Sequence, residues 1–438
     1  MKDTPIWFHT FGCKANQYDT ERMRQELEDL GGARVARPDG AQVAVVNTCT
    51  VTNQADADAR HLIRRLRRDH PDLKILVAGC SAALRESDYE AMPEVDGVVP
   101  GQDPAHVAEA LTGLGVLDAT TGLGVIDAPG EPGSRPLERN ARGTRAWLKV
   151  QDGCDRKCSF CATRLARGSS RSRPMDEIVR EAESLAAGHP ELVITGIHIG
   201  HYGHDLAAGS TLARLCERLL ETVPARIRLS SIEATEIDDQ MVGLLVDSGG
   251  QLAPHLHVPL QSGSDRVLKL MQRWHTRDSY ARRVEAIAER VPRLGLGADV
   301  IVGFPGEGDV EFEDTRVLVE VLPFTYLHVF PYSARDGTVA ASLPGTVPGD
   351  IAAARSRELR ELALQKGESY RKRRIGESVD VVVEGMDVAS SGLTGDYLRV
   401  EVRGDARPGD RFEAVLRVDG DSLCVHPPSW RLPGEEEV

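Results

Sequence analysis

Short apolar stretches alternate with longer amphipathic stretches along most of this 438-residue sequence. This alternation is typical of βαβ units, whose strands form a parallel sheet with helices on both faces. We therefore predict that residues 1–112 form a doubly wound α/β domain. Its predicted elements are strands at 6–9, 43–46 and 74–78 and helices at 19–30 and 55–68.

A second alternation with wider spacing begins near residue 144. Six βα units are expected there, which favours an incomplete barrel related to the eight-fold one and open on one side for a large substrate. We assign this domain to residues 144–349, followed by a connecting helix at 350–373. The predicted strands are 147–151, 192–197, 226–232, 256–261, 297–303 and 326–332.

The remaining segments differ in character. Residues 374–438 contain strands with a period of two, separated by Gly and Asp turns, which predicts a small all-β barrel. Residues 113–143 are rich in Gly and Pro and include a near-duplication within 112–128. We interpret 113–143 as a linker and assign the duplication no function.

The eight cysteines narrow the possible functions. The sequence has no apolar run near the ~20 residues that span a bilayer and no apolar signal segment at its start, so we expect a cytoplasmic protein without membrane contact. Reducing conditions there favour metal binding or catalysis over disulfides. Cys216 and Cys424 lie in helix-like and strand-like patterns and are expected to be buried core thiols.

Three cysteines are clustered as CxxxCxxC at Cys154, Cys158 and Cys161, directly after the first predicted barrel strand. Three thiolates can hold three irons of a cubane cluster and leave the fourth iron open. An open iron can chelate S-adenosylmethionine and pass an electron to its sulfonium. The alternative, a zinc site, favours CxxC pairs with a fourth ligand, which this segment lacks. Phe160 could pack against an adenine.

Three further cysteines are distant in sequence but share one context. Cys13, Cys49 and Cys80 each follow a predicted strand and precede a helix, roughly one βαβ unit apart. In a parallel sheet they would meet at the carboxyl edge, where open α/β folds bind ligands. This suggests a second three-cysteine cluster, although three small residues at tight turns would give the same spacing.

With both cysteine sets placed, the chain resembles the radical S-adenosylmethionine methylthiotransferases along nearly its whole length. The resemblance rests on the segments 12–18, 47–52 and 79–80, on the CxxxCxxC with Arg167-Gly168 after it, and on the segments 259–264 and 299–307. It implies that the central domain is a radical S-adenosylmethionine barrel and the C-terminal barrel an RNA-binding TRAM domain.

The resemblance also implies cofactors and site residues. It implies two 4Fe-4S clusters, ligated by the two cysteine sets, and S-adenosylmethionine; the auxiliary cluster of Cys13, Cys49 and Cys80 supplies sulfur. It further implies an external reductant such as flavodoxin. The expected cofactor-binding residues are Phe160, Gly196, Ser231, Glu233, Gln261, Gly303, Phe304, Pro305 and Gly306.

The branch that the chain is most similar to acts on N6-threonylcarbamoyladenosine at position 37 of tRNA, judging by the segments 47–53, 195–198 and 328–333. Two segments depart from the family pattern, 162–166 after Cys161 and 81–83 after Cys80. The same chemistry on isopentenyladenosine-37, or on a ribosomal-protein aspartate, therefore stays open. An alternative of a different class is a non-enzymatic iron–sulfur carrier.

A tRNA substrate must be reconciled with a net charge of −14. Phosphate contacts need clustered cations, but local patches rather than the total charge set the field at a binding face. Basic clusters occur in each predicted domain, and we expect a monomer that uses them to bind tRNA. The candidate RNA-binding residues are Arg64, Arg68, Arg167, Arg171, Arg371 and Arg373.

Overall fold

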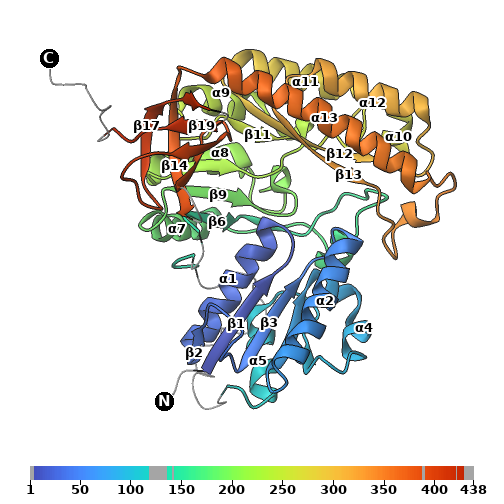
Figure 1. Ribbon diagram of the computed structural model, residues 1–438, viewed down its shortest axis with the longest axis vertical. Coiled ribbons are helices and arrows are strands. Elements are labelled where there is room, and N and C mark those ends of the chain that lie inside the picture. The colour runs from blue at the N-terminus through green and yellow to red at the C-terminus, as the bar shows by residue number, and fades with distance from the viewer. Residues whose placement is uncertain (1–3, 118–135, 141–142, 387–389, 421, 429–438) are drawn as a thin grey trace. The chain divides into compact units, whose positions relative to one another are not determined.

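The N-terminal part of the computed structural model is a five-stranded parallel sheet in the order β2-β1-β3-β4-β5 (Figure 1). The structure describes residues 4–117, 136–140, 143–386, 390–420 and 422–428. The strands of this sheet are β1 (Thr4–Thr10), β2 (Gly32–Arg34), β3 (Val43–Thr48), β4 (Lys74–Gly79) and β5 (Gly97–Val98).

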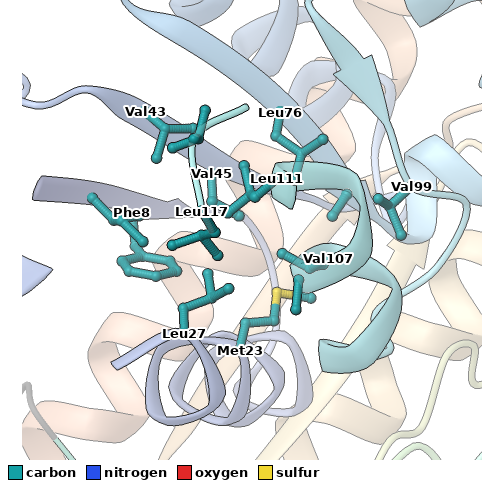
Figure 2. Packing of buried hydrophobic residues seen from close by; sticks show 14 residues of the cluster. Phe8, Met23, Leu27, Val43, Val45, Leu76, Val99, Val107, Leu111 and Leu117 are labelled. Atoms are coloured by element: carbon teal, nitrogen blue, oxygen red, sulfur yellow. The ribbon is translucent and has the colours of Figure 1, made fainter. Parts of the chain in front are cut away.

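Alternating side chains of these strands supply two separate cores. Val43 and Val45 point to one face, and Ala44 and Val46 point to the other. Because successive strand residues face opposite sides, a fully apolar strand needs a helical layer on each face. Figure 2 shows the first core, in which Met23 contributes from the helix that follows β1. The helices of this region are α1 (Lys14–Asp29), α2 (Asn53–Asp69), α3 (Cys80–Leu84), α4 (Glu86–Glu90) and α5 (Pro104–Gly113).

The described residues divide into two compact units. The first combines the N-terminal sheet with Lys149–Arg173 and Ser333–Ala341. The Lys149–Arg173 segment carries the two-stranded pair β7 (Gln151–Asp152) and β8 (Arg171–Ser172) and the short helix α6 (Thr163–Arg167).

The second unit contains the predicted barrel strands in chain order. They form the three-stranded sheets β6-β9-β10 and β11-β12-β13, and the bridge between Ser231 and His257 links the two. The strands are β6 (Arg145–Lys149), β9 (Glu191–Thr195), β10 (Arg226–Leu229), β11 (His255–His257), β12 (Gly295–Val302) and β13 (Tyr326–Pro331). The helices are α7 (Met175–Ala186), α8 (Leu212–Thr222), α9 (Asp239–Asp247), α10 (Asp265–Leu270), α11 (Arg277–Arg290), α12 (Asp309–Val321) and α13 (Gly349–Arg374).

A curled, all-strand sheet follows α13 in the order β17-β14-β15-β16-β19-β18 (Figure 1). Its core includes Val381, Val383, Val400 and Val425, the inward-facing residues of the period-two pattern. The strands are β14 (Ser378–Met386), β15 (Ser390–Thr394), β16 (Arg399–Val402), β17 (Arg411–Val415), β18 (Arg417–Asp419) and β19 (Ser422–Val425).

Buried ion pairs join this sheet to the barrel strands within the second unit. The Glu191 carboxylate accepts hydrogen bonds from Arg226 and Arg228, and both guanidiniums continue to carbonyls of the C-terminal sheet. Burial opposes the charge of Glu191, but the two arginines hold the pKa of this carboxyl well below its usual range.

The predicted fold class is confirmed: a doubly wound sheet, a partial barrel of six strands and a small all-β domain. The boundaries 1–112, 113–143, 144–349, 350–373 and 374–438 stay predictions. Most of the linker and the duplication within it lie outside the described residues. Among the helices in the described ranges, none is long and apolar enough to cross a membrane.

Candidate functional site

The carboxyl edge of the N-terminal sheet brings together the three distant cysteines. Cys13 precedes α1, Cys49 directly follows β3, and Cys80 opens α3. The parallel register places Thr48 beside Gly79, so Cys49 and Cys80 leave adjacent strands at the same level. Cys13 is exposed, whereas Cys49 and Cys80 are buried. All eight cysteines lie in the described residues, and none of them is in a disulfide.

Glycines let the backbone approach these thiols closely. Gly12 has a φ of +97°, and a Cβ added there would lie 2.4 Å from Cys49 Sγ. Gly79 has a φ of +99°, and its added Cβ would lie 2.2 Å from Asn47 Oδ1. Positive φ and absent side-chain space are both conditions that only glycine meets without strain. Glycine is therefore required before Cys13 and Cys80 for the backbone to pack this closely at the carboxyl edge of the sheet.

A buried polar cluster supports the same edge. The Asn16 amide donates to the carbonyls of Phe11 and Thr48 at 2.9 Å each, which ties α1 to the loops before Cys13 and Cys49. Asn47 in turn donates to the Asn16 carbonyl and the Thr20 hydroxyl at 2.9 Å each. These bonds fix the loop ends because a buried amide left unpaired is costly.

Arg167 lies at the cysteine edge with its side chain fully buried. Its Nε donates to Cys80 Sγ at 3.2 Å. The guanidinium also pairs with Asp19 at 2.7 Å and with Asp152 at 2.9 Å. We expected Arg167 on an RNA-binding surface; that expectation was wrong for this arginine, because a fully buried guanidinium with two carboxylate partners cannot reach a phosphate.

Their surroundings raise the pKa of the two buried thiols, Cys49 and Cys80. Burial raises the pKa of Cys80 to about 12, and the nearby Arg167 opposes that rise. Burial likewise raises the pKa of Cys49, against a hydrogen bond from the Val51 amide and the Arg167 charge. Burial therefore favours the neutral form of these two thiols, and a metal bound to them would favour the thiolate.

The CxxxCxxC loop belongs to the same compact unit as the distant cysteines. The Cys154 amide donates to the Gly168 carbonyl at 3.0 Å, and the Cys161 amide donates to the Cys158 carbonyl at 3.2 Å. Cys154, Cys158 and Cys161 are all partly exposed, as is Phe160 between the last two. Three thiols thus share one accessible loop.

A second buried amide holds the start of this loop. Gln151 Nε2 donates to the Gly153 carbonyl at 2.6 Å and to the Ser170 hydroxyl at 2.8 Å. Gly153 has a φ of +70°, and a Cβ there would collide with the Ser169 carbonyl. The loop is therefore closed on itself by residues that immediately flank it.

The expected cofactor-binding residues of the barrel follow strand ends in the second unit. Gly196 follows β9, Ser231 and Glu233 follow β10, and Gln261 lies beyond β11. Gln261 has a φ of +66°. Its amide donates to the Asp299 carbonyl and its carbonyl accepts from the Ile301 amide, both in β12. A non-glycine residue with positive φ is costly and occurs preferentially at functional sites.

The segment after β12 is held by one carboxylate. Glu307 accepts from the Gly303 amide at 2.8 Å and from Arg355 at 2.8 Å. Phe304, within this segment, is fully buried and packs edge-to-face on Tyr332 at 5.2 Å between centroids. Its side chain therefore belongs to the core, which leaves the backbone of Phe304, and not its ring, for a cofactor.

Sequence reasoning missed several partners of these residues. Burial raises the pKa of Glu233 although Arg273 forms an ion pair with it. His198 Nε2 pairs with the Glu236 carboxylate at 2.8 Å. In the first unit, Arg335 donates to the Thr50 carbonyl beside Cys49. These contacts join residues 30 or more positions apart and carry no local sequence signal.

The other expected RNA-binding arginines are exposed. Arg64 and Arg68 lie on the outer side of α2, Arg171 follows the CxxxCxxC loop, and Arg371 and Arg373 lie near the end of α13. Arg68 pairs with Asp69, but its side chain is still 72% exposed. Exposed surface ion pairs are weak, so this cation can exchange its partner for a phosphate.

Comparison with protein families gives the class of the molecule. Residues 5–100 match the model described as "Uncharacterized protein family UPF0004", and residues 148–319 match the radical SAM superfamily. Among solved structures, a radical S-adenosylmethionine methyltransferase from Kitasatospora setae has a TM-score of 0.51 at 16% identity, covering 75% of this chain and 73% of that one. At this identity the likeness shows the fold alone.

Curated relatives narrow the class to a family. The threonylcarbamoyladenosine tRNA methylthiotransferase MtaB of Rickettsia prowazekii is 37% identical over 93% of both chains. The protein of the same name from Thermotoga maritima is 38% identical over 91% of this chain and 92% of its own. The chain therefore belongs to the MtaB family of radical S-adenosylmethionine methylthiotransferases.

Proposed function

We propose that this enzyme methylthiolates C2 of N6-threonylcarbamoyladenosine at position 37 of tRNA, giving 2-methylthio-N6-threonylcarbamoyladenosine. The observation that carries the proposal is the similarity to tRNA methylthiotransferases of this substrate class over more than nine-tenths of the chain. The two family matches, over residues 5–100 and 148–319, include both cysteine sets.

Two 4Fe-4S clusters and S-adenosylmethionine are the cofactors of this chemistry. We assign one cluster to Cys154, Cys158 and Cys161 and the auxiliary cluster to Cys13, Cys49 and Cys80. The donor sets fit, because each offers three cysteine thiols within one compact unit, and none of these cysteines is in a disulfide. When bound, the first cluster supplies the electron that cleaves S-adenosylmethionine, and the auxiliary cluster supplies sulfur.

The protein's own residues position these groups. Gly12 and Gly79 let the auxiliary cysteines converge, and Arg167 donates to Cys80. The Cys154 loop is partly exposed, as a loop must be if its cluster is to meet a small-molecule cofactor.

For S-adenosylmethionine we propose contacts from the strand ends of the barrel. Gly196, Ser231, Gln261 and the backbone of 303–306 lack bulky charged groups and suit close approach. Arg273 pairs with one oxygen of the buried Glu233 carboxylate, and we propose that the other oxygen accepts from a ligand amine. Phe160, partly exposed in the cysteine loop, is proposed to pack against the adenine.

The tRNA backbone is proposed to contact Arg64, Arg68, Arg171, Arg371 and Arg373, which are all exposed. Clustered exposed cations supply phosphate affinity even when the whole chain is acidic. A flavodoxin-type reductant, a monomeric state and a cytoplasmic location complete the proposal.

Nucleoside mass spectrometry of tRNA from a deletion strain tests this function, with and without the restored gene. Loss and return of 2-methylthio-N6-threonylcarbamoyladenosine is the expected result. If the isopentenyl counterpart disappears instead, the chemistry stands and the substrate assignment fails. If neither nucleoside changes, ribosomal protein becomes the substrate to examine. If the reduced protein forms no 5′-deoxyadenosine, it is a carrier and not an enzyme.

A further inference from the structure

Arg167 links two segments that are far apart in the sequence. It ends α6, directly after the CxxxCxxC loop, yet its Nε donates to Cys80 Sγ at 3.2 Å. Its other nitrogens are also engaged: Nη1 donates to Asp152 at 2.9 Å, and Nη2 donates to Asp19 at 2.7 Å and to Asn16 Oδ1 at 2.6 Å. Every nitrogen has an acceptor, so the planar group is held in one orientation.

The charges around Arg167 are balanced. Lys149 Nζ lies 2.5 Å from Asp19 and 2.8 Å from Asp152, the same two carboxylates that Arg167 contacts. The four side chains carry two positive and two negative charges, and all are buried or nearly so. Removing any one of them leaves an uncompensated charge close to Cys80, in a medium that screens charge poorly.

We propose that Arg167 is a positioning residue that raises the reduction potential of the iron–sulfur cluster bound through Cys80. This inference rests on the proposed function, because it requires a cluster on Cys13, Cys49 and Cys80. Reduction adds one electron to a cluster. A positive charge and an N–H···S bond at a ligand thiolate stabilise the reduced form more than the oxidised form.

Two substitutions with opposite charge changes test the inference. Arg167→Gln removes a positive charge and weakens the bond to Cys80, so the midpoint potential should become more negative. Asp19→Asn removes a negative charge from the same group, so the potential should become more positive. Both are measured by titration monitored by electron paramagnetic resonance, in a background with Cys154, Cys158 and Cys161 changed to Ala so that the other cluster is absent.

Two further variants separate charge from hydrogen bonding and position. Arg167→Lys keeps the charge without the planar fork, and its potential should fall between those of the parent protein and Arg167→Gln. Arg164→Gln, on the same helix but exposed, is the matched control and should leave the potential unchanged.

The outcomes distinguish failure of this inference from failure of the proposed function on which it rests. If the background protein retains no iron after reconstitution, the proposed ligand set of the auxiliary cluster fails. If iron is retained but Arg167→Gln leaves the potential in place, or Asp19→Asn shifts it to a more negative value, the inference is overturned. If Arg167→Gln does not fold, Asp19→Asn decides: a positive shift supports the inference, and an unchanged potential overturns it.

Discussion

The two cysteine sets lie in one compact unit but are assembled in different ways. Cys154, Cys158 and Cys161 share one short loop, closed by bonds among residues 151–170. Cys13, Cys49 and Cys80 come from three strand ends and meet only when the sheet has formed. A site made by one loop depends on local geometry, whereas a site made by strand ends depends on the whole domain and on every group that fixes their register.

The largest expected effect separates the roles of the two sets. Cys154→Ala should abolish formation of 5′-deoxyadenosine and therefore all product. Cys13→Ala should spare cleavage of S-adenosylmethionine but abolish methylthiolated nucleoside. Both are measured on the same anaerobically reconstituted preparations by mass spectrometry. Equal loss of both activities in Cys13→Ala would contradict a division of labour between the two sets.

A glycine substitution tests whether the distant set, Cys13, Cys49 and Cys80, needs the backbone at Gly12 to lie close to Cys49. Gly12→Ala should expel the auxiliary cluster, because its Cβ would lie 2.4 Å from Cys49 Sγ. Iron should fall by about half, from about eight to about four atoms per chain, if each set holds one 4Fe-4S cluster. Gly31→Ala is the control: its φ is +87°, but nothing lies within 4 Å of the added Cβ. It should cost about 1–2 kcal/mol of backbone strain and keep both clusters. If Gly12→Ala keeps about eight iron atoms per chain, the carboxyl edge of the sheet can shift enough to accept the added Cβ.

The same contrast explains what could be predicted from sequence. The strands at 43–46 and 74–78 are short apolar runs, and their alternation was enough to give the parallel sheet and the shared edge of the three cysteines. The six barrel strands were found for the same reason. The predicted strand ends differ from the observed ones by a few residues, because the last residue pair of a strand depends on contacts that a sequence window does not contain.

The wrong prediction that Arg167 contacts RNA also has a physical cause. In sequence it is one cation among several near the cluster loop, and charge alone favours an exposed phosphate ligand. Its burial follows from Asp19 and Asp152, which lie in a helix and a strand that only the fold brings together. Phe304 is a similar case, since its ring turns into the core. Local motifs predicted which cysteines are candidate metal ligands, but not which charged side chains lie beside them.

Two buried amides provide a smaller and matched perturbation. Asn47→Ala should remove two hydrogen bonds beneath the distant set, and Gln151→Ala should remove those at the base of the loop. Each should lower the free energy of unfolding by about 1–3 kcal/mol in an anaerobic urea titration. Only Asn47→Ala should also loosen the auxiliary cluster, seen as faster iron loss to a chelator in a background with Cys154, Cys158 and Cys161 changed to Ala. Equal iron loss in both variants would remove the contrast.

The smallest effect is expected for a histidine in the barrel unit. Burial, with a contribution from Arg273, lowers the pKa of His275 from 6.5 to about 4. Because the unfolded chain binds this proton more readily than the folded one, stability is full above pH 6.5 and is lost as the pH falls toward 4. Between pH 7 and pH 5.5 the loss should be about 1 kcal/mol. His275→Gln, which is neutral throughout and can still donate to the Leu260 carbonyl, should remove this component from a urea titration at the two pH values. Iron content of the parent protein should be equal at both; if iron is lost first, acid acts on the cysteine sets and not on the barrel.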